Sequence, residues 1–147
     1  MSPVYVRLCT GACKRQEGAV LSVQLKMVGL MVEDMARSLG FYRRLELEIP
    51  EGAEEQVHVE VEIGSGVMLF WDAAFVGAYD PDREKPQGGY RILLEFFVGS
   101  KEAVDARYEE LVAEGHRGHK EPFETHFGAY MAMVDDPDGN TVLLTAG

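Results

Sequence analysis

Strict alternation of apolar and polar residues marks residues 57–63 as a half-buried strand. The valines of this segment alternate with His58, Glu60 and Glu62, so the valines share one face of the strand and the polar trio shares the other. We expect a helix to cover the valine face. The polar face then borders either solvent or a cavity, and the alternation by itself leaves both alternatives open.

Two further segments combine an N-capping residue with apolar residues at helical spacing. The first follows Asp34 and is predicted to end near Arg43 and Arg44, whose positive charges suit the carboxyl end of a helix. The second follows Ser100 and is predicted to end at Gly115, where a left-handed residue is wanted. Both helices should therefore pack one apolar face against a sheet.

The remaining apolar runs predict strands on either side of each helix. Around the first helix these are residues 23–32, 45–49, 56–63 and 67–72; around the second they are residues 90–98 and a hairpin over 129–145. Residues 116–128 are predicted to form a loop with at most one short strand. The hairpin turns at Asp136-Pro137-Asp138-Gly139, where Pro137 fixes its own φ, Asp138 can bond the backbone just ahead, and Gly139 can take a positive φ.

The pattern repeats along the chain at a constant offset of 66 residues. Val32 matches Val98, Asp34 matches Ser100, Tyr42 matches Tyr108 and Leu45 matches Leu111. We therefore predict an α+β fold of two tandem β-α-β-β-β modules within one domain, residues 24–147. Module one covers 24–72, a polar linker or lid covers 73–89, module two covers 90–147, and residues 1–23 form an N-terminal extension.

Two stretches, residues 32–42 and residues 134–140, resemble the vicinal oxygen chelate superfamily of glyoxalases, bleomycin resistance proteins and extradiol dioxygenases. The first is a strand-to-helix transition, Val-Glu-Asp-Met-Ala-Arg-Ser-Leu-Gly-Phe-Tyr, and the second is Val-Asp-Asp-Pro-Asp-Gly-Asn. The resemblance implies that the modules form a cupped mixed sheet with a small-molecule site in its concave face. It also implies a homodimer.

Metal-using members of this superfamily place four side chains, usually His, Gln or Glu, in the concave face. The corresponding positions in this sequence are Met27, Leu69, Leu93 and Leu143, the second of them uncertain by one residue. Transition metals of this class need nitrogen or oxygen donors, which these side chains lack. We therefore expect no family metal site, no other cofactor and no metal-dependent glyoxalase or dioxygenase activity, and we assign no catalytic residue.

Other polar and aromatic residues are candidates for a ligand site, each with a plainer alternative. Glu95 either faces a ligand or pairs with Arg91, two residues away on the same strand. Trp71 and Tyr130 suit a core better than a ligand platform. His116, His119 and His126 suit a solvated loop better than a metal cluster. The full set of candidate ligand-binding residues is Met27, His58, Glu60, Glu62, Leu69, Trp71, Arg91, Leu93, Glu95, Phe97, His126, Tyr130 and Leu143.

The charge and composition of the chain limit its plausible binding partners and cellular location. The net charge of the chain is −11; residues 1–24 contribute +2, so the other 123 residues carry −13. Such a surface disfavours nucleic acid and anionic membranes. No apolar run is long enough to cross a bilayer, the N-terminus does not have a signal-peptide pattern, and Cys9 and Cys13 form neither a zinc motif nor a disulfide framework. We expect a cytoplasmic protein.

Two functions are consistent with these observations. The first is a metal-free protein that binds or sequesters a small, drug-like, neutral or cationic molecule. The alternative is a lyase, isomerase or dioxygenase of the same superfamily that uses an atypical metal site or no metal. The metal content of the purified protein would separate them.

Overall fold

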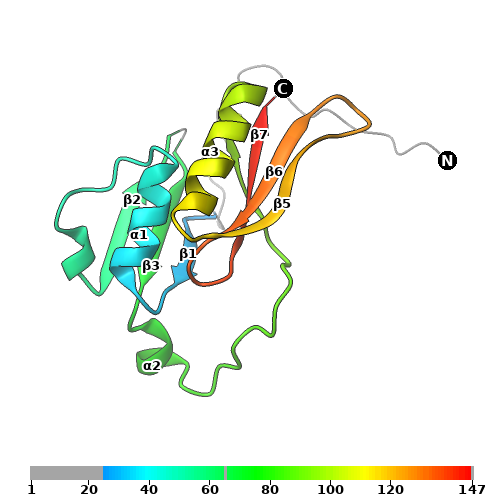
Figure 1. Ribbon diagram of the computed structural model, residues 1–147. Coiled ribbons are helices and arrows are strands. Elements are labelled where there is room, and N and C mark those ends of the chain that lie inside the picture. The colour runs from blue at the N-terminus through cyan, green and yellow to red at the C-terminus, as the bar shows by residue number, and fades with distance from the viewer. Residues whose placement is uncertain (1–24, 65, 147) are drawn as a thin grey trace, which may run out of the picture.

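Two mixed β-sheets form the framework of the protein in the computed structural model, which describes residues 25–64 and 66–146. The first sheet has the strand order β1-β3-β2 (Figure 1). Strand β1 (Val28–Met31) runs parallel to β3 (Met68–Asp72), which pairs antiparallel with β2 (His58–Glu62). All three strands come from the first half of the sequence.

The second sheet has the strand order β4-β7-β6-β5. Strand β4 (Leu94–Phe97) runs parallel to β7 (Thr141–Ala146), whereas β6 (Tyr130–Asp135) pairs antiparallel with both β7 and β5 (Arg117–Glu124). This topology repeats that of the first sheet with one more strand. The predicted α+β class with two tandem modules is confirmed, and each module forms one mixed sheet.

Helices α1 (Met35–Arg44) and α3 (Lys101–Ala113) lie on the same side of the two sheets (Figure 1). The side chain of Asp34 accepts a hydrogen bond from the Arg37 N–H at 3.0 Å, and that of Ser100 accepts one from the Ala103 N–H at 3.1 Å. Each side chain satisfies a backbone donor that the first helical turn leaves free. Both predicted N-caps, and the positive φ of Gly115 behind α3, are confirmed.

Strand alternation gives each sheet a helix face, turned toward the helices, and an open face on the other side. In the first sheet the helix face carries Val59, Val61, Leu69 and Trp71, all buried. The open face carries His58, Glu60 and Glu62, which are exposed. The predicted separation from the polar trio is therefore confirmed for Val59 and Val61, whereas Val57 precedes the strand and is exposed.

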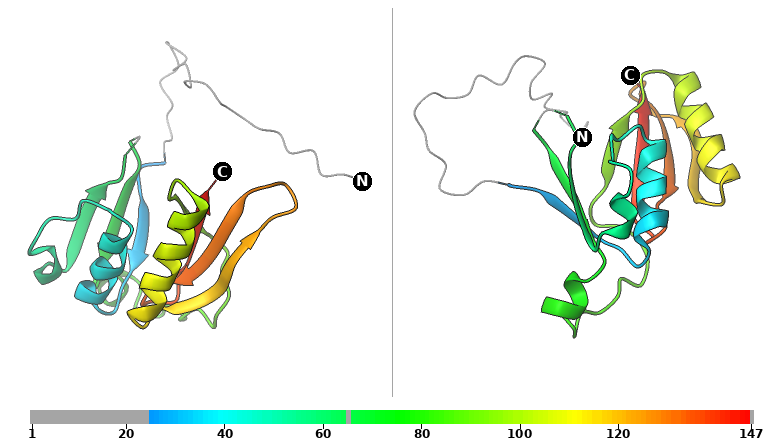
Figure 2. Two further views of the ribbon diagram at one scale, coloured as in Figure 1. Left: turned by 45° about the horizontal axis from the view of Figure 1, so that its top comes forward. Right: turned by 90° about the vertical axis from the view of Figure 1, so that its left-hand side faces the viewer.

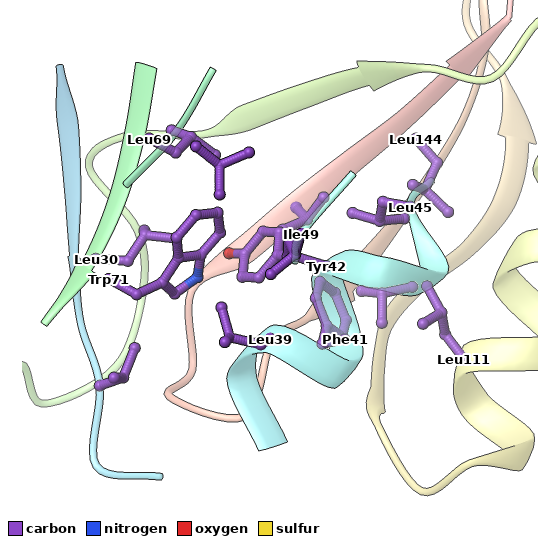
Figure 3. Close-up of a cluster of buried hydrophobic side chains, with 14 of the residues drawn as sticks. Leu30, Leu39, Phe41, Tyr42, Leu45, Ile49, Leu69, Trp71, Leu111 and Leu144 are labelled. Atoms are coloured by element: carbon purple, nitrogen blue, oxygen red, sulfur yellow. The ribbon is translucent and has the colours of Figure 1, made fainter. Parts of the chain in front are cut away.

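The core fills the space between the helix faces and α1 (Figure 3). The fully buried ring of Tyr42 lies edge-on to Trp71, with 5.3 Å between ring centroids, and 6.4 Å from Phe96 on β4. One side chain of α1 thus contacts both sheets. Burial of aromatic rings of this size is a large stabilising contribution to the packing of the two halves.

The predicted strand over residues 45–49 is wrong, because this segment folds back on α1. Leu45 caps the helix, Glu46 has a positive φ of 64°, and the Leu47 N–H bonds to the Tyr42 carbonyl at 3.4 Å. Leu45 and Ile49 are nevertheless buried. The apolar residues of this segment alternate with polar ones because the turn places them against the core. A strand with one buried face would produce the same spacing.

The predicted loop over residues 116–128 is also corrected, because β5 occupies Arg117–Glu124. Two register shifts interrupt its pairing with β6, and most of its side chains are exposed. An exposed edge strand with irregular register has little apolar alternation for a sequence pattern to detect. Beyond it, a turn at residues 125–129 leads into β6.

The segment that connects the two sheets contains less extended backbone than the sequence pattern predicts. The short helix α2 (Phe75–Tyr79) follows β3, and residues 90–93 form a bend before β4 instead of part of a strand. The expectations for residues 1–23, including a strand at residues 4–6 and the roles of Cys9 and Cys13, lie outside the described residues. Within the described part of the chain, no helix is long and apolar enough to span a membrane.

Candidate functional site

A cleft of about 840 Å³ lies at the seam between the two sheets. Residues of the β2–β3 turn and of β4 both contribute to its lining, and Figure 2 (right) shows the strands of the first sheet diverging from those of the second. Its volume falls within the range of about 300–1,000 Å³ that is usual for small-molecule sites. The lining residues are Val28, Glu46, Leu47, Glu48, Glu62, Ile63, Gly64, Val67, Leu69, Leu93, Leu94, Glu95, Phe96 and Phe97.

The positions of β4 and of two turns explain why these residues line one cleft. Strand β4 is the last strand of its sheet, so residues from both of its faces can border a cleft at its free edge. The turn after α1 supplies a second wall, because the positive φ of Glu46 redirects residues 46–48 toward the seam. The β2–β3 turn supplies the third wall.

The cleft combines apolar side chains with four carboxylates. Glu46 accepts a hydrogen bond from Arg107 at 2.8 Å, and Glu95 accepts one from the Thr145 hydroxyl at 3.0 Å. No ion pair is formed by Glu48 or Glu62 within residues 25–64 and 66–146. The arrangement can bind a molecule with an apolar body, and it offers hydrogen-bond acceptors more readily than donors.

The structure brings together some of the predicted ligand residues and separates others. The cleft contains Glu62, Leu69, Leu93, Glu95 and Phe97. The residues that lie elsewhere are Met27, His58, Glu60, Trp71, Arg91, His126, Tyr130 and Leu143.

Several of these outlying residues have structural contacts of their own. Trp71 is fully buried in the core, and the Tyr130 hydroxyl donates to Asp105 of α3 at 2.7 Å. Arg91 lies in the bend before β4, and among the described residues no ion pair joins it to Glu95. Of the two alternatives for Glu95, the pair with Arg91 is therefore not formed among the described residues, and Glu95 bonds Thr145 instead. His126 lies in the turn before β6, with its ring 5.2 Å from that of Phe127.

His58 forms a separate polar cluster on the open face of the first sheet. Its Nδ1 lies 2.8 Å from Asp72 Oδ2, and its Nε2 lies 3.0 Å from Glu60 Oε1. These hydrogen bonds, that of Glu60 first, raise the pKa of His58 above its ordinary value. Asp72 also accepts hydrogen bonds from the Ala74 and Phe75 N–H groups, so it links His58 to the start of α2.

The four positions that carry metal ligands in the superfamily do not form a donor set here. Leu143 lies on the open face of the second sheet, where it pairs with Glu95 of β4, whereas Leu93 lies in the bend just before β4. Leu69 pairs with Val28 and lies on the helix face of the first sheet, so the prediction that it shares a face with Met27 is wrong. The open-face neighbours of Leu69 are Met68 and Phe70, which offer no oxygen or nitrogen donor either.

The histidines of module two do not converge on one point. His116 lies edge-on to Phe41, with 4.9 Å between ring centroids, and burial lowers its pKa. His119 on β5 lies 3.2 Å from Asp135. Within the described part of the chain, no group of three or more His, Cys, Asp or Glu residues is arranged to hold a metal ion. The residues present therefore do not fit the superfamily's metal.

Sequence reasoning missed the wall formed by Glu46, Leu47 and Glu48, and also Leu94 and Phe96 of β4. The first three fall within the predicted strand over residues 45–49, in which neighbouring residues would point to opposite faces. For β4, the predicted ligand residues all belong to one face of the strand. The signal that could have found them is the position of β4 at the edge of its sheet, because an edge strand exposes both faces and its backbone.

Comparison with known proteins agrees with this architecture. The family model described as Glyoxalase/Bleomycin resistance protein/Dioxygenase superfamily matches residues 24–144. A comparison with curated proteins found no match.

Many solved structures share the fold, with sequence identities that establish the fold alone. Hypothetical protein SA1046 from S. aureus is 21% identical, with a TM-score of 0.70 over 85% of this chain and 95% of that one. A glyoxalase/bleomycin resistance protein/dioxygenase family enzyme from Burkholderia phytofirmans is 23% identical, with a TM-score of 0.69 over 84% and 98%. A lactoylglutathione lyase from Agrobacterium tumefaciens is 22% identical, with a TM-score of 0.59 over 84% and 93%.

Proposed function

The chain belongs to the glyoxalase/bleomycin resistance protein/dioxygenase superfamily, and on that premise we propose that it binds a small organic molecule, without a metal, in the cleft between its sheets. The observation that carries this proposal is the cleft itself. It joins two sheets from different halves of the chain and is lined mainly by apolar side chains. Sites that bind small molecules commonly have this composition, with a few polar groups that set orientation.

The side chains at the superfamily's metal positions support binding over metal-dependent chemistry. Met27, Leu93 and Leu143 supply no hard donor. The cleft itself is lined by apolar side chains and four carboxylates. Such a cleft can hold and sequester a ligand without changing it.

A neutral, environment-sensitive dye such as Nile red tests the proposal directly. Its fluorescence should rise when the wild-type protein is added. The substitution Val67→Trp should reduce this binding at least about tenfold, because Val67 lines the cleft and a larger side chain would fill it.

A matched control is available at an equivalent position, because Val57 directly precedes β2 as Val67 directly precedes β3. Val57 is exposed, with 64% of its surface accessible, and lies outside the cleft. Val57→Trp should therefore bind the dye like the wild type, and circular dichroism should show that both variants are folded. Equal binding by Val67→Trp and Val57→Trp would place the dye elsewhere and contradict the proposal.

A further inference from the structure

Strand β4 has one backbone edge with no strand partner in the described part of the chain. It is the end strand of its sheet and pairs with β7 alone. The Val98 N–H bonds to the Thr145 carbonyl of β7 at 2.8 Å, and backbone groups alternate between the two sides of a strand. The N–H and carbonyl groups of Glu95 and Phe97 therefore point away from β7, toward the cleft that both residues line.

This free edge of β4 is suited to accept a further strand. Soluble proteins usually cover such an edge or protect it with Lys, Pro or a bulge. Residues 94–97 contain no Lys or Pro, and they pair with β7 without a bulge. Phe97 is 69% exposed, and Val67 in another wall of the cleft is 47% exposed. An added strand would therefore satisfy backbone groups and cover apolar side chains together.

The sequence contains a matching segment that joins the structure beside this cleft. Residues 1–24 precede β1, whose first residue, Val28, also lines the cleft. Residues 4–8 read Val-Tyr-Val-Arg-Leu, so that apolar residues at 4, 6 and 8 alternate with Tyr5 and Arg7, a pattern typical of a strand. Residues 9–27 would connect this strand to β1. At about 3.3 Å per extended residue, that connection is long enough to reach β4.

Charge favours the same contact. Residues 1–24 contain Arg7, Lys14 and Arg15 against Glu17, a net charge of +2. Four carboxylates line the cleft, and none of its described lining residues is Lys, Arg or His. A cationic segment of the same chain is therefore attracted to the cleft, and its tether gives it an effective concentration of about the millimolar range.

We propose that residues 4–8 add to the free edge of β4 as a fifth strand of the second sheet and so cover the cleft. This inference goes beyond the proposed function, because it concerns a contact within the chain made by residues that precede the family match at 24–144. The apolar residues of the added strand pack beside Leu94 and Phe96, which contact the core, and Arg7 lies on the side of Glu95. A covered cleft binds small molecules more weakly, so the segment acts as an internal inhibitor.

Amide hydrogen exchange measured by NMR tests the added strand and needs no ligand. The test variant of the full chain is Tyr5→Pro with Val6→Pro. Adjacent N–H groups point to opposite edges of a strand, so this double substitution removes a donor from whichever edge faces β4. The Glu95 and Phe97 amides should exchange at least about tenfold more slowly in the wild type than in the variant. The Phe96 amide, which points toward β7, should be equally protected in both.

Ala19→Pro with Val20→Pro is the matched control, because it places two prolines in the same segment but outside residues 4–8. Its amides should exchange like those of the wild type. Nile red provides a second measurement. It should bind the Tyr5→Pro, Val6→Pro variant at least about threefold more tightly than the wild type or the control, because the cleft is uncovered in more of the molecules.

The outcomes separate this inference from the proposed function. Equal exchange at Glu95 and Phe97 in the wild type and the test variant overturns the added strand. Protection that survives in the test variant but falls on dilution identifies a second copy of the chain at this edge, and it also overturns the inference. Protection of the wild type without a change in Nile red affinity overturns the inhibitory role. If the wild type is protected as expected but Nile red binds none of the proteins, the added strand stands and the proposed function is wrong.

Discussion

The Tyr42 hydroxyl donates a hydrogen bond to Asp136 Oδ2 at 2.8 Å, across 94 positions of the sequence. Tyr42 belongs to α1 and Asp136 to the β6–β7 turn, so the bond joins the two modules inside the protein. Asp136 also accepts hydrogen bonds from the Asp138 and Asn140 N–H groups at 2.9 and 2.8 Å. One carboxylate therefore organises the turn and receives the tyrosine.

Removing this hydroxyl should lower the stability of the protein but still allow it to fold. Tyr42→Phe keeps the ring between the sheets but deprives the buried Asp136 of a donor, so the free energy of unfolding should fall by about 1.5–3 kcal/mol. Urea denaturation measures this change. Tyr79→Phe, at a position 78% exposed in α2, is the control and should unfold like the wild type; an equal effect of both substitutions would contradict the role of the buried bond.

The ring of Phe70 occupies the space that a side chain at position 29 would need, so we expect glycine to be required there. A Cβ added to Gly29 would lie 2.1 Å from Phe70 Cζ, so Gly29→Ala must displace the ring from the open face. We expect a loss of about 1–3 kcal/mol in unfolding free energy. Gly40→Ala is the control, because no atom lies within 4 Å of the added Cβ and alanine favours a helix; it should leave stability unchanged or raise it.

Stability should depend on pH through His58. The raised pKa of His58 means that its bonds to Glu60 and Asp72 stabilise the fold fully below about pH 6.5, the ordinary value, and that this contribution is lost as pH rises through the folded-state pKa. For Asp72, burial raises the pKa, but the hydrogen bonds from His58, Ala74 and Phe75 outweigh it, so the net pKa is lowered. Its contribution is present above about pH 4 and is lost as pH falls further.

The melting temperature measured between pH 4 and pH 9 should reveal this contribution as a difference between variants. His58→Gln should lose stability relative to the wild type near pH 5 to 6, and the two curves should converge at higher pH. His126→Gln changes an exposed histidine of the turn before β6 and should follow the wild type throughout. Parallel curves for the wild type and His58→Gln would exclude a titrating His58 contact.

We expect the purified protein to hold no stoichiometric transition metal, because the superfamily's ligand positions carry Met27, Leu69, Leu93 and Leu143. Elemental analysis after dialysis should find well below one zinc, iron, nickel or manganese per chain. One tightly retained ion per chain would refute this expectation and would favour the enzymatic alternative.

We also propose that the protein is a homodimer. The open faces of the sheets carry apolar residues such as Met31, Phe70 and Met133, which are only partly buried within one chain. Partly exposed apolar residues on a sheet face are suited to an interface, and two-fold pairs are the commonest soluble assembly. Sedimentation at micromolar concentration should give twice the chain mass of 16.3 kDa; a species of single mass would rule the dimer out.

Several features can be predicted from the sequence alone, because they depend on interactions between residues that are close together in the chain. Asp34 and Ser100 were recognisable as N-caps because each bonds the backbone only three residues ahead. The positive φ at Gly115 and Gly139 follows from the absence of a side chain. The repeat at 66 residues was sufficient to predict two related sheets, because burial on one face imposes the same periodicity wherever the element recurs.

Tertiary structure decided the features that depend on distant neighbours. Leu45 and Ile49 have the spacing of a strand, but burial against α1 and the positive φ of Glu46 turn them back on the helix. Asp138 was expected to bond the backbone just ahead of it, but it accepts a hydrogen bond from the Glu33 N–H at 3.0 Å, while Asp136 bonds the turn.

The candidate site likewise combines residues that the sequence predicts with residues that only the tertiary structure identifies. Strand alternation in the sequence identified Glu62, Glu95 and Phe97, the family resemblance identified Leu93, and all four line the cleft. The sequence could not place Leu69 on the helix face or bring residues 46–48 to the seam, because a face is settled only by which strand pairs with which and in what register. Periodicity specifies that a residue is buried; the packing of two sheets specifies what it is buried against.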